Sequence, residues 1–270
     1  MGSFIVDEDT TLKNFTDTHH AQASFYFTAL LKAKEIKVNG KKVSADMPLS
    51  VGDTVQYFLT EKQLAKKAFH VVYEDEQVIL VDKESGVNSE AVFAALSREQ
   101  TAYFVHRLDR NTQGLLVFGK TEEANAELLL AFKEHRIEKT YLALCFGKFP
   151  KKTEILTAYL KKDAAGGVQI FSRSVDGAER IITEYEVLSK EKDVSLVKIR
   201  LHTGKTHQIR AHLAFIGCPI VGDMRYGNTA KNREKNKARQ CLIAKELTLK
   251  TQGVLAYLNG KIFRSQFSFE

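Results

Sequence analysis

One short segment carries an ionisable group where it could do chemistry. The residues VHRLDRNTQGLLVFGKT, 105–121, place Asp109 between Arg107 and Arg110, at a polar turn between two apolar runs. A carboxylate near the floor of a cleft protonates unless a cation or hydrogen-bond donors favour its charged form. An arginine can do so with two parallel N–H groups. Arg210, on a predicted helix, is a candidate partner for this carboxylate.

An ionised, oriented carboxylate could attack a carbon atom or stabilise an oxocarbenium-like sugar, as the nucleophile of a retaining glycosidase does. A structural salt bridge involving Asp109 is the simpler alternative, and the charge pattern alone favours it. A hydrolase acting on nucleosides or sugars would also need a second carboxylate as its acid, and no paired site is evident in the sequence.

Two segments partly match phosphoryl-transfer motifs, but neither contains the full motif. The tetrapeptide HRLD, residues 106–109, has a leucine that the HRD loop of kinases lacks, and Gly114 stands where the metal-binding asparagine belongs. The tripeptide GKT, residues 204–206, ends like a P-loop, but Ile199 replaces the first glycine of that motif. The sequence therefore argues against nucleotide-phosphate chemistry.

Metal and disulfide chemistry are not indicated either. His202, His207 and His212 are five residues apart rather than four, and no acidic partner accompanies them in the sequence. We therefore expect structural, hydrogen-bonding histidines. The three cysteines form no Cys-x-x-Cys pair, which favours reduced cysteines in a core.

The helix that carries Arg210 is predicted over the segment THQIRAHLAFIG, residues 206–217. Apolar residues recur at helical spacing from Ile209 to Ile216, and Thr206 is the expected N-cap. Arg210 would then project from the first two turns of a helix whose apolar face is buried.

Strand and helix patterns alternate irregularly elsewhere, without an internal repeat. Two short strands are expected in 71–86 around an acidic turn, with further strands over 139–147 and 194–202. A helix is expected over 122–136, with Thr121 as its N-cap and acidic residues in its first turn.

Residues 12–60 form a compact basic unit, followed by a predicted linker over 59–70. A helical pattern leads into a hairpin turn at Asn39-Gly40. Five lysines and one glutamate lie between Lys32 and Lys42. Such a cluster suits a phosphate backbone, although a solvated face would have the same composition.

The bulk properties agree with an anionic partner without requiring one. The 270 residues carry a formal net charge of +7, with 44% hydrophobic and 27% charged residues. Nucleic acid is the commonest partner of basic proteins. Residues 225–239 contain six Lys or Arg and one Glu, and we expect a mobile loop there. No signal peptide and no apolar run of 18 residues is present, so we expect a cytoplasmic protein without a membrane association.

Three blocks of the chain together resemble the RluA-type pseudouridine synthases: HRLDRNTQGLLVFGKT, EKTYLALCFG and LHTGKTHQIRAHLAFIGCPIVGDMRYG. The similarity extends over roughly residues 70–255. The pattern VNG…V…GD.V in the basic unit resembles the S4 RNA-binding fold. The resemblance implies an S4-like RNA-binding domain over 1–60 and a catalytic domain over 61–270. It also implies an α+β fold, with a mixed, mainly antiparallel sheet and flanking helices.

The resemblance assigns roles to five residues. Asp109 matches the catalytic aspartate, and Arg210 matches the arginine that pairs with it. Tyr141 matches an active-site tyrosine that packs on the target base and can take a proton late in the reaction. Arg107 matches an arginine that can fill the space left by a flipped nucleotide. Leu242 matches an apolar residue that lines the pocket.

The chain departs from the family pattern at four places. One is the stretch 87–104, which is short and lacks the usual Pro-Gly before the VHRLD segment. Thr-Gln-Gly at 112–114 replaces Thr-Ser-Gly, Lys-Glu-Ser-Gly at 83–86 replaces Lys-Pro-x-Gly, and Ile243 replaces a frequent histidine. None of these differences removes a proposed chemical group.

The expected activity is the isomerisation of a uridine in RNA: the N-glycosidic bond breaks, the uracil rotates, and it is rejoined to the sugar through carbon. The reaction consumes no water, redox equivalent or phosphate, so we expect neither a cofactor nor a metal. The combination with an S4-like domain favours ribosomal RNA, with transfer RNA second. We also expect a monomeric enzyme. A catalytically dead RNA-binding protein is the alternative, against which the intact Asp109, Tyr141 and Arg210 argue.

Overall fold

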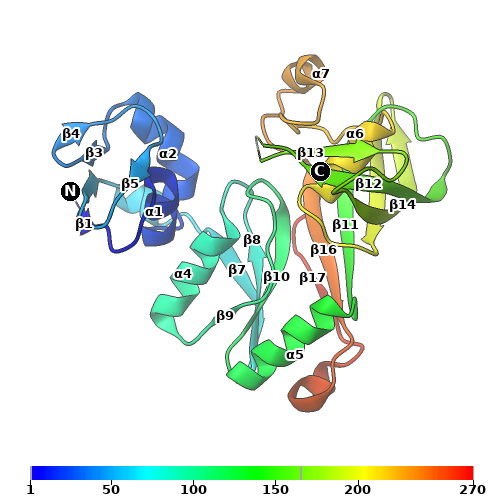
Figure 1. The fold of residues 1–270 in the computed structure, drawn as a ribbon, viewed down its shortest axis with the longest axis horizontal. Helices are drawn as coiled ribbons and strands as arrows, with labels where there is room; N and C mark the ends of the chain where they lie inside the picture. Colours follow the sequence, from blue (N-terminus) through cyan, green and yellow to red (C-terminus); the bar gives the residue numbers. More distant parts are fainter. Residues whose placement is uncertain (1, 165, 270) are drawn as a thin grey trace.

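The computed structural model describes residues 2–164 and 166–269. A small N-terminal unit, predicted over residues 1–60, lies beside a larger body built on one long sheet (Figure 1). The elements of the N-terminal unit are β1 (Gly2–Ile5), β2 (Thr10–Thr11), α1 (Leu12–His19), α2 (Ala23–Lys32), β3 (Lys37–Val38), β4 (Lys41–Lys42), β5 (Pro48–Leu49) and β6 (Thr54–Tyr57). Its strands form a four-stranded sheet in the order β1-β6-β3-β4 and a separate β2-β5 pair.

The N-terminal unit has a hydrophobic cluster of its own, which runs from Val6 to Leu59. The predicted hairpin is confirmed: β3 and β4 pair across Asn39 and Gly40, which have φ angles of 50° and 76°. Two consecutive residues with positive φ are what the tight hairpin turn requires. The Asn39 side chain also accepts a hydrogen bond from the Thr54 backbone N–H, which ties the hairpin to β6. An S4-like identity of this unit stays a prediction.

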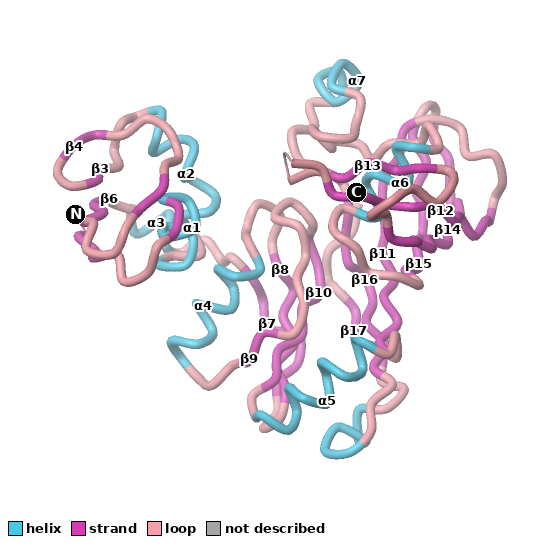
Figure 2. Tube along the Cα trace, in the orientation of Figure 1, coloured by secondary structure: helices cyan, strands magenta, loops and turns pink. Residues whose placement is uncertain are grey.

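The larger body contains the remaining elements: α3 (Glu61–Leu64), β7 (Phe69–Glu74), β8 (Val78–Lys83), α4 (Ser89–Glu99), β9 (Tyr103–Phe104), β10 (Gln113–Gly119), α5 (Glu122–Lys133), β11 (Ile137–Phe146), β12 (Thr153–Lys162), β13 (Val168–Phe171), β14 (Glu179–Glu191), β15 (Val194–Leu201), α6 (Gln208–Phe215), α7 (Thr229–Glu234), β16 (Leu242–Leu249), the 3-10 helix η1 (Gly253–Leu258) and β17 (Ile262–Arg264). The 11-stranded sheet has the order β13-β12-β14-β15-β11-β16-β10-β8-β7, with β17 paired to β16 and β9 paired to β10. Strands dominate this body, as Figure 2 shows. Every named strand pair is antiparallel except β10 with β16, so the predicted mixed, mainly antiparallel fold is confirmed.

The centre of the sheet is apolar on both faces. Along β10, Leu115 and Val117 point into one hydrophobic cluster, whereas Leu116 and Phe118 point into another. This alternation follows from the two-residue period of a strand. Helices α5 and η1 cover the first cluster, and α4 and α6 cover the second. The continuous apolar run of residues 114–118 therefore marks a strand buried between two layers of helix.

The parallel contact between β10 and β16 is short and depends on a glycine. Only Gln113 with Ile243 and Gly114 with Ala244 are in register. Gly114 has a φ of 113°, and a Cβ atom there would lie 2.3 Å from the Ala244 carbonyl oxygen. Any other residue at position 114 would push the two strands apart.

Local predictions were confirmed for several elements and wrong for others. Helix α5 begins after Thr121, whose hydroxyl accepts a hydrogen bond from the Ala124 N–H, as predicted. The predicted linker over 59–70 contains the one-turn helix α3, which a capping box stabilises. The basic segment 225–239, expected as a loop, contains helix α7. No helix in the described ranges is long and apolar enough to cross a membrane.

Candidate active site

Asp109 lies in the loop between β9 and β10, and buried polar groups fix that loop. The hydroxyl of Ser89, at the start of α4, accepts a hydrogen bond from the Leu108 N–H at 2.9 Å and donates one to the Leu108 carbonyl at 3.1 Å. The Thr112 N–H donates to the Asp109 carbonyl at 2.9 Å, which closes a tight turn. The backbone before Asp109 is therefore fixed to α4, and the backbone after it is closed into a turn.

Lys83, the last residue of β8, is hydrogen-bonded to the same loop. Its fully buried ammonium group donates to the carbonyls of Glu84 at 3.0 Å, Val87 at 2.8 Å and Arg110 at 3.0 Å. Burial lowers the pKa of Lys83 to about 7, and the charge of Asp109 opposes that shift. Lys83 is the first residue of the Lys-Glu-Ser-Gly segment, which here joins the turn after β8 to the Asp109 loop.

Arg210 and Asp109 are brought together, but not as the sequence predicted. Arg210 Nη1 donates to Asp109 Oδ2 at 2.8 Å, while its Nε and Nη2 donate to the two carboxylate oxygens of Asp223 at 2.7 and 3.1 Å. The expected two-point contact to Asp109 is thus made to Asp223 instead. The Asp223 side chain is 1% exposed, against 25% for Asp109. Asp223 therefore orients the guanidinium, which presents its remaining edge to Asp109.

Arg210 and Asp223 stabilise each other's charged forms. Burial raises the pKa of Asp223, but Arg210 and the backbone N–H groups of Tyr226 and Arg225 outweigh burial and hold it below its usual value. Burial likewise lowers the pKa of Arg210, and the two carboxylates raise it above its usual value. Asp223 was not among the site residues predicted from the sequence. The signal was present in the segment IVGDMRYG, where an acidic residue lies at a turn after apolar residues.

His207 is the N-cap of α6, where the sequence predicted Thr206. It has a left-handed φ of 54° and makes no side-chain capping hydrogen bond. Its Nε2 lies 3.9 Å from Asp109 Oδ2, and its Nδ1 lies 2.9 Å from the hydroxyl of Tyr226. The Tyr226 hydroxyl accepts a hydrogen bond from the Val168 N–H, so it can donate to Nδ1. Strained backbone at a non-glycine residue is common at functional sites.

The expectation that no acidic partner accompanies the histidines was wrong for two of them. His207 faces Asp109, and His202 Nε2 lies 2.9 Å from Glu184 Oε2. His212 fits the structural interpretation: it is buried, and its Nδ1 lies 3.0 Å from the Thr183 hydroxyl. The acidic partners of His202 and His207 lie on a different strand and in a different loop, so the linear sequence did not reveal them.

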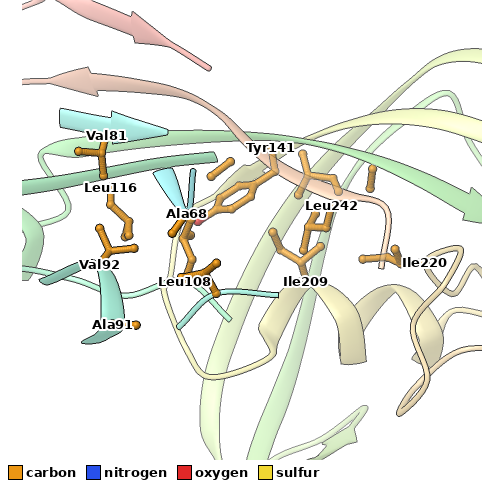
Figure 3. Close-up of a cluster of buried hydrophobic side chains, with 14 of the residues drawn as sticks. Ala68, Val81, Ala91, Val92, Leu108, Leu116, Tyr141, Ile209, Ile220 and Leu242 are labelled. Atoms are coloured by element: carbon orange, nitrogen blue, oxygen red, sulfur yellow. The ribbon is translucent and has the colours of Figure 1, made fainter. Parts of the chain in front are cut away.

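Tyr141 and Leu242 contribute apolar surface to the same cavity as the charged groups. Tyr141 lies on β11, directly after a register shift against β16, and Leu242 is the first residue of β16. Figure 3 shows the Tyr141 ring in one cluster with Leu108, Ile209 and Leu242. Burial and the charge of Asp109 raise the pKa of the Tyr141 phenol well above its usual value. The phenol is therefore neutral near pH 7.

Arg107 lies at the mouth of the site, not against Asp109. Its side chain is 71% exposed, and its Nη2 lies 3.3 Å from Glu90 Oε1. Arg110, on the other side of Asp109, reaches into the N-terminal unit, where Nη1 donates to Asp17 Oδ2 at 2.7 Å. The two arginines that flank Asp109 in the sequence thus point away from its carboxylate, and the distant Arg210 pairs with it.

One cavity collects all five predicted site residues. It has a volume of about 280 Å³ and is lined by Arg107, Asp109, Tyr141, Arg210 and Leu242 together with His106, His207 and Lys139. This volume is just below the usual range for ligand sites, roughly 300–1,000 Å³. The polar side continues into a neighbouring cavity of about 510 Å³, which Asp109, Arg110, Lys205 and Gln240 help to line. Residues 2–164 and 166–269 contain no group of three His, Cys, Asp or Glu side chains that could hold a metal ion.

The arrangement suits a substrate with one flat, apolar-faced part and one part that develops charge near a carboxylate. Comparison with known proteins identifies the class. Residues 77–215 match the family model of the RNA pseudouridylate synthases. A protein of Rickettsia bellii named ribosomal large subunit pseudouridine synthase C is 33% identical over 230 residues, which cover 73% of this chain and 76% of that protein.

Two further proteins agree with this match. An uncharacterized RNA pseudouridine synthase of Mycoplasma genitalium is 33% identical over 247 residues, covering 81% of this chain and 76% of its own length. The solved structure of human RNA pseudouridylate synthase domain containing 1 superimposes with a TM-score of 0.60 at 26% identity, over 68% of this chain and 79% of that one. The chain belongs to the RNA pseudouridylate synthase family, and it is an RNA pseudouridine synthase of the RluA type.

Proposed function

We propose that this enzyme isomerises a uridine of ribosomal RNA, and that Asp109 is its catalytic residue. The observation that carries the assignment is the Asp109–Arg210–Asp223 network beside the cavity that Tyr141 and Leu242 line. The choice of RNA rests on the relatives, among them the synthase of Rickettsia bellii, whose name specifies the large ribosomal subunit. An enzyme of ribosomal RNA would act in the cytoplasm, and we propose that it does so as a monomer.

The chemistry is an internal exchange of bonds. The bond from uracil N1 to ribose C1′ breaks, a bond from C5 to C1′ forms, C5 loses a proton, and N1 gains one. Atoms and charge balance without water or a cofactor. Asp109 would serve either as the nucleophile or as the base that begins the exchange. In each case it must be ionised and aimed, and Arg210 Nη1 at 2.8 Å from Oδ2 favours both.

Tyr141 would form the surface on which the uracil packs. Its ring borders the cavity, and its phenol is neutral because burial raises its pKa. A neutral phenol cannot accept the C5 proton unless it first releases its own. The raised pKa therefore supports the packing role of Tyr141 more strongly than a role as a base.

Arg107 would act when the uridine leaves its stack. Extruding a base costs a few kcal/mol, least in a loop or bulge. The Arg107 side chain is exposed at the cavity mouth and has one ion pair, with Glu90. It can leave this pair at small cost, because exposed ion pairs contribute only about 0–1 kcal/mol. It is therefore free to enter the space that the flipped nucleotide vacates.

The N-terminal unit, residues 1–60, would supply RNA affinity. Four of its five clustered lysines, those at 32, 34, 41 and 42, are exposed around the β3–β4 hairpin. Lysines of this kind bind phosphates without reading sequence. The unit and α7, which carries part of the second basic segment, lie on opposite sides of the upper ends of β8 and β10 (Figures 1 and 2). An RNA over the Asp109 loop could therefore meet cations on both sides.

Mapping of new pseudouridines tests this proposal. The enzyme and its Asp109→Asn variant are incubated with total RNA from cells that lack the enzyme. A site in large-subunit ribosomal RNA that appears with the enzyme and not with the variant is the expected result. Sites in transfer RNA alone would overturn the choice of substrate. RNA binding without any new pseudouridine would mean that the protein binds RNA but does not modify it.

A further inference from the structure

An ion pair between a buried carboxylate and a partly exposed guanidinium joins the N-terminal unit to the active-site loop. Asp17, on α1, has a fully buried side chain, and its Oδ2 accepts from Arg110 Nη1 at 2.7 Å and from Asn88 Nδ2 at 2.9 Å. Lys13 Nζ lies 3.4 Å from the same oxygen. Asp17 Oδ1 is buried without a hydrogen-bond partner in the described part of the chain. In the described part of the chain, the cations within 4 Å of this carboxylate are Lys13, from its own helix, and Arg110.

Further contacts come from the same corner between α1 and α2. Arg110 Nη2 donates to the Ser24 carbonyl at 2.7 Å. Arg98, at the end of α4, donates to the carbonyls of Thr18 and His19, both at 2.7 Å, and so satisfies the last turn of α1. The corner, which we define as residues 17–25, therefore contacts α4 as well as the Asp109 loop.

The corner also shares a core with the catalytic body. Ala21 and Phe25 belong with the cluster that contains Val81, Leu116 and Tyr141, and not with the cluster of the N-terminal unit. A unit connected by a flexible linker alone would have no reason to bury a carboxylate and an aromatic ring against its neighbour. The position of the corner is consequently specified by packing and by charge.

Arg110 is the residue through which the corner acts on catalysis. It directly follows Asp109, and its carbonyl accepts hydrogen bonds from Lys83 Nζ at 3.0 Å and from the Gly86 N–H at 2.9 Å. Its backbone is thus anchored to β8, and its side chain is anchored to the N-terminal unit. If the corner moved away, the Arg110 side chain would lose its contacts with Asp17 and with the Ser24 carbonyl, and the peptide next to Asp109 would lose one of its two anchors.

We propose that Asp17 and Arg110 are positioning residues, and that docking of the α1–α2 corner holds Asp109 in its reactive orientation. This inference rests on the proposed role of Asp109. It makes the N-terminal unit part of the catalytic apparatus as well as an RNA-binding element. The partner surface is within the same chain, and its recognition chemistry is a buried carboxylate paired with a guanidinium.

Asp17→Asn, Arg110→Gln and the double variant test the proposal, with Glu8→Gln as a matched control, since Glu8 is an exposed acid of the same unit. The substrate is a stem-loop too short to reach the β3–β4 hairpin, assayed at saturation. We expect each single variant to lower kcat about 10- to 100-fold with KM nearly unchanged, as small misplacements of reacting groups do. The double variant should be no slower than the slower single one, because both remove the same contact.

Hydrogen exchange supplies a readout that does not depend on activity. Backbone amides of the loop at 105–112 should exchange faster in Asp17→Asn than in the parent or in Glu8→Gln. Unchanged kcat with raised KM would overturn the proposal, because the corner would then affect RNA binding only. Unchanged exchange in the loop would overturn it as well. If the parent made no pseudouridine at all, the proposed function would fail, and the exchange experiment would still decide whether the corner fixes the loop.

Discussion

Replacement of Arg210 by alanine tests the network at the centre of the site. The change removes three hydrogen bonds to two carboxylates, one to Asp109 and two to Asp223. The two acids differ in what remains. Asp109 is 25% exposed and can be rehydrated, whereas Asp223 is 1% exposed and keeps hydrogen bonds from the backbone N–H groups of Arg225 and Tyr226. The cost therefore arises mainly at Asp223.

Removing one partner of a buried ion pair costs about 3–5 kcal/mol in the free energy of unfolding. We expect Arg210→Ala to fall in this range at pH 7, measured from urea unfolding curves. Arg107→Ala is the matched control, since it removes an exposed arginine with one ion pair and should change the same free energy by less than about 0.5 kcal/mol. The double variant Arg210→Ala with Asp223→Asn should recover at least about 1 kcal/mol, because it also removes the unpaired charge.

The pH dependence separates lost charge pairing from lost packing. Without Arg210, the pKa of Asp223 in the folded state should rise above its unfolded value, because burial is no longer opposed by a cation. Between the unfolded and the folded pKa of Asp223, the folded variant then binds more protons than the unfolded chain. Its free energy of unfolding therefore falls as the pH rises through this interval. The loss in the free energy of unfolding, relative to the parent, should be larger at pH 7 than at pH 5. Activity, measured as release of tritium from RNA labelled at uridine C5, should be lost.

Two results would refute this reasoning. If Arg210→Ala unfolds within about 1 kcal/mol of the parent, the guanidinium does not hold a buried charge. If the loss in the free energy of unfolding is the same at pH 5 and pH 7 and the Asp223→Asn change recovers nothing, the cost comes from lost packing. Asp223 would then not orient Arg210 through its charge.

Four other predictions concern different parts of the molecule. Asp109→Asn should abolish tritium release while RNA affinity stays within about twofold, because shape is kept and charge is lost; retained turnover would rule out Asp109 as the essential carboxylate. Deletion of residues 1–60 should reduce the salt dependence of RNA binding by about 0.7–0.9 log units for each lost phosphate contact. It should also lower kcat, through the loss of Asp17, and an unchanged salt slope would show that the unit does not bind RNA. Gly114→Ala should destabilise the protein by more than about 1 kcal/mol, since a Cβ there would lie 2.3 Å from a carbonyl oxygen; circular dichroism melting would check this, and an unchanged melting temperature would contradict it. Burial lowers the pKa of His212 to about 4, so the unfolded chain takes up the proton first as the pH falls below about 6.5. Through this group the parent should lose about 2 kcal/mol of its free energy of unfolding by pH 5, and His212→Asn should lose correspondingly less. Urea unfolding at pH 7 and pH 5 would measure both losses.

The sequence by itself determined the local elements and the class of protein. A hairpin at Asn39-Gly40 and a helix after Thr121 follow from turn and capping preferences that act within a few residues. The three motif blocks determined the family, because their order and spacing are specific to it. The same blocks placed Asp109, Tyr141 and Arg210 as candidates, and all three line one cavity.

Only the tertiary structure decided which charges meet. Arg210 is 101 residues from Asp109 in the chain and 13 from Asp223, and both acids lie at turns. Sequence spacing gave no means to choose between them as the two-point partner, since that choice depends on where two loops approach α6. His207 became the N-cap in place of Thr206 for a similar reason, because its ring lies between Asp109 and Tyr226.

The contact between the N-terminal unit and the active-site loop could not be predicted from the sequence. Asp17 lies 93 residues before Arg110, and nothing in the helix pattern of α1 distinguishes this acid from a solvated one. Its burial follows from the approach of α1 to α4 and to the Asp109 loop. Local preferences fix the conformation of each segment, whereas the pairing of buried charges depends on distances between segments that only the assembled fold sets.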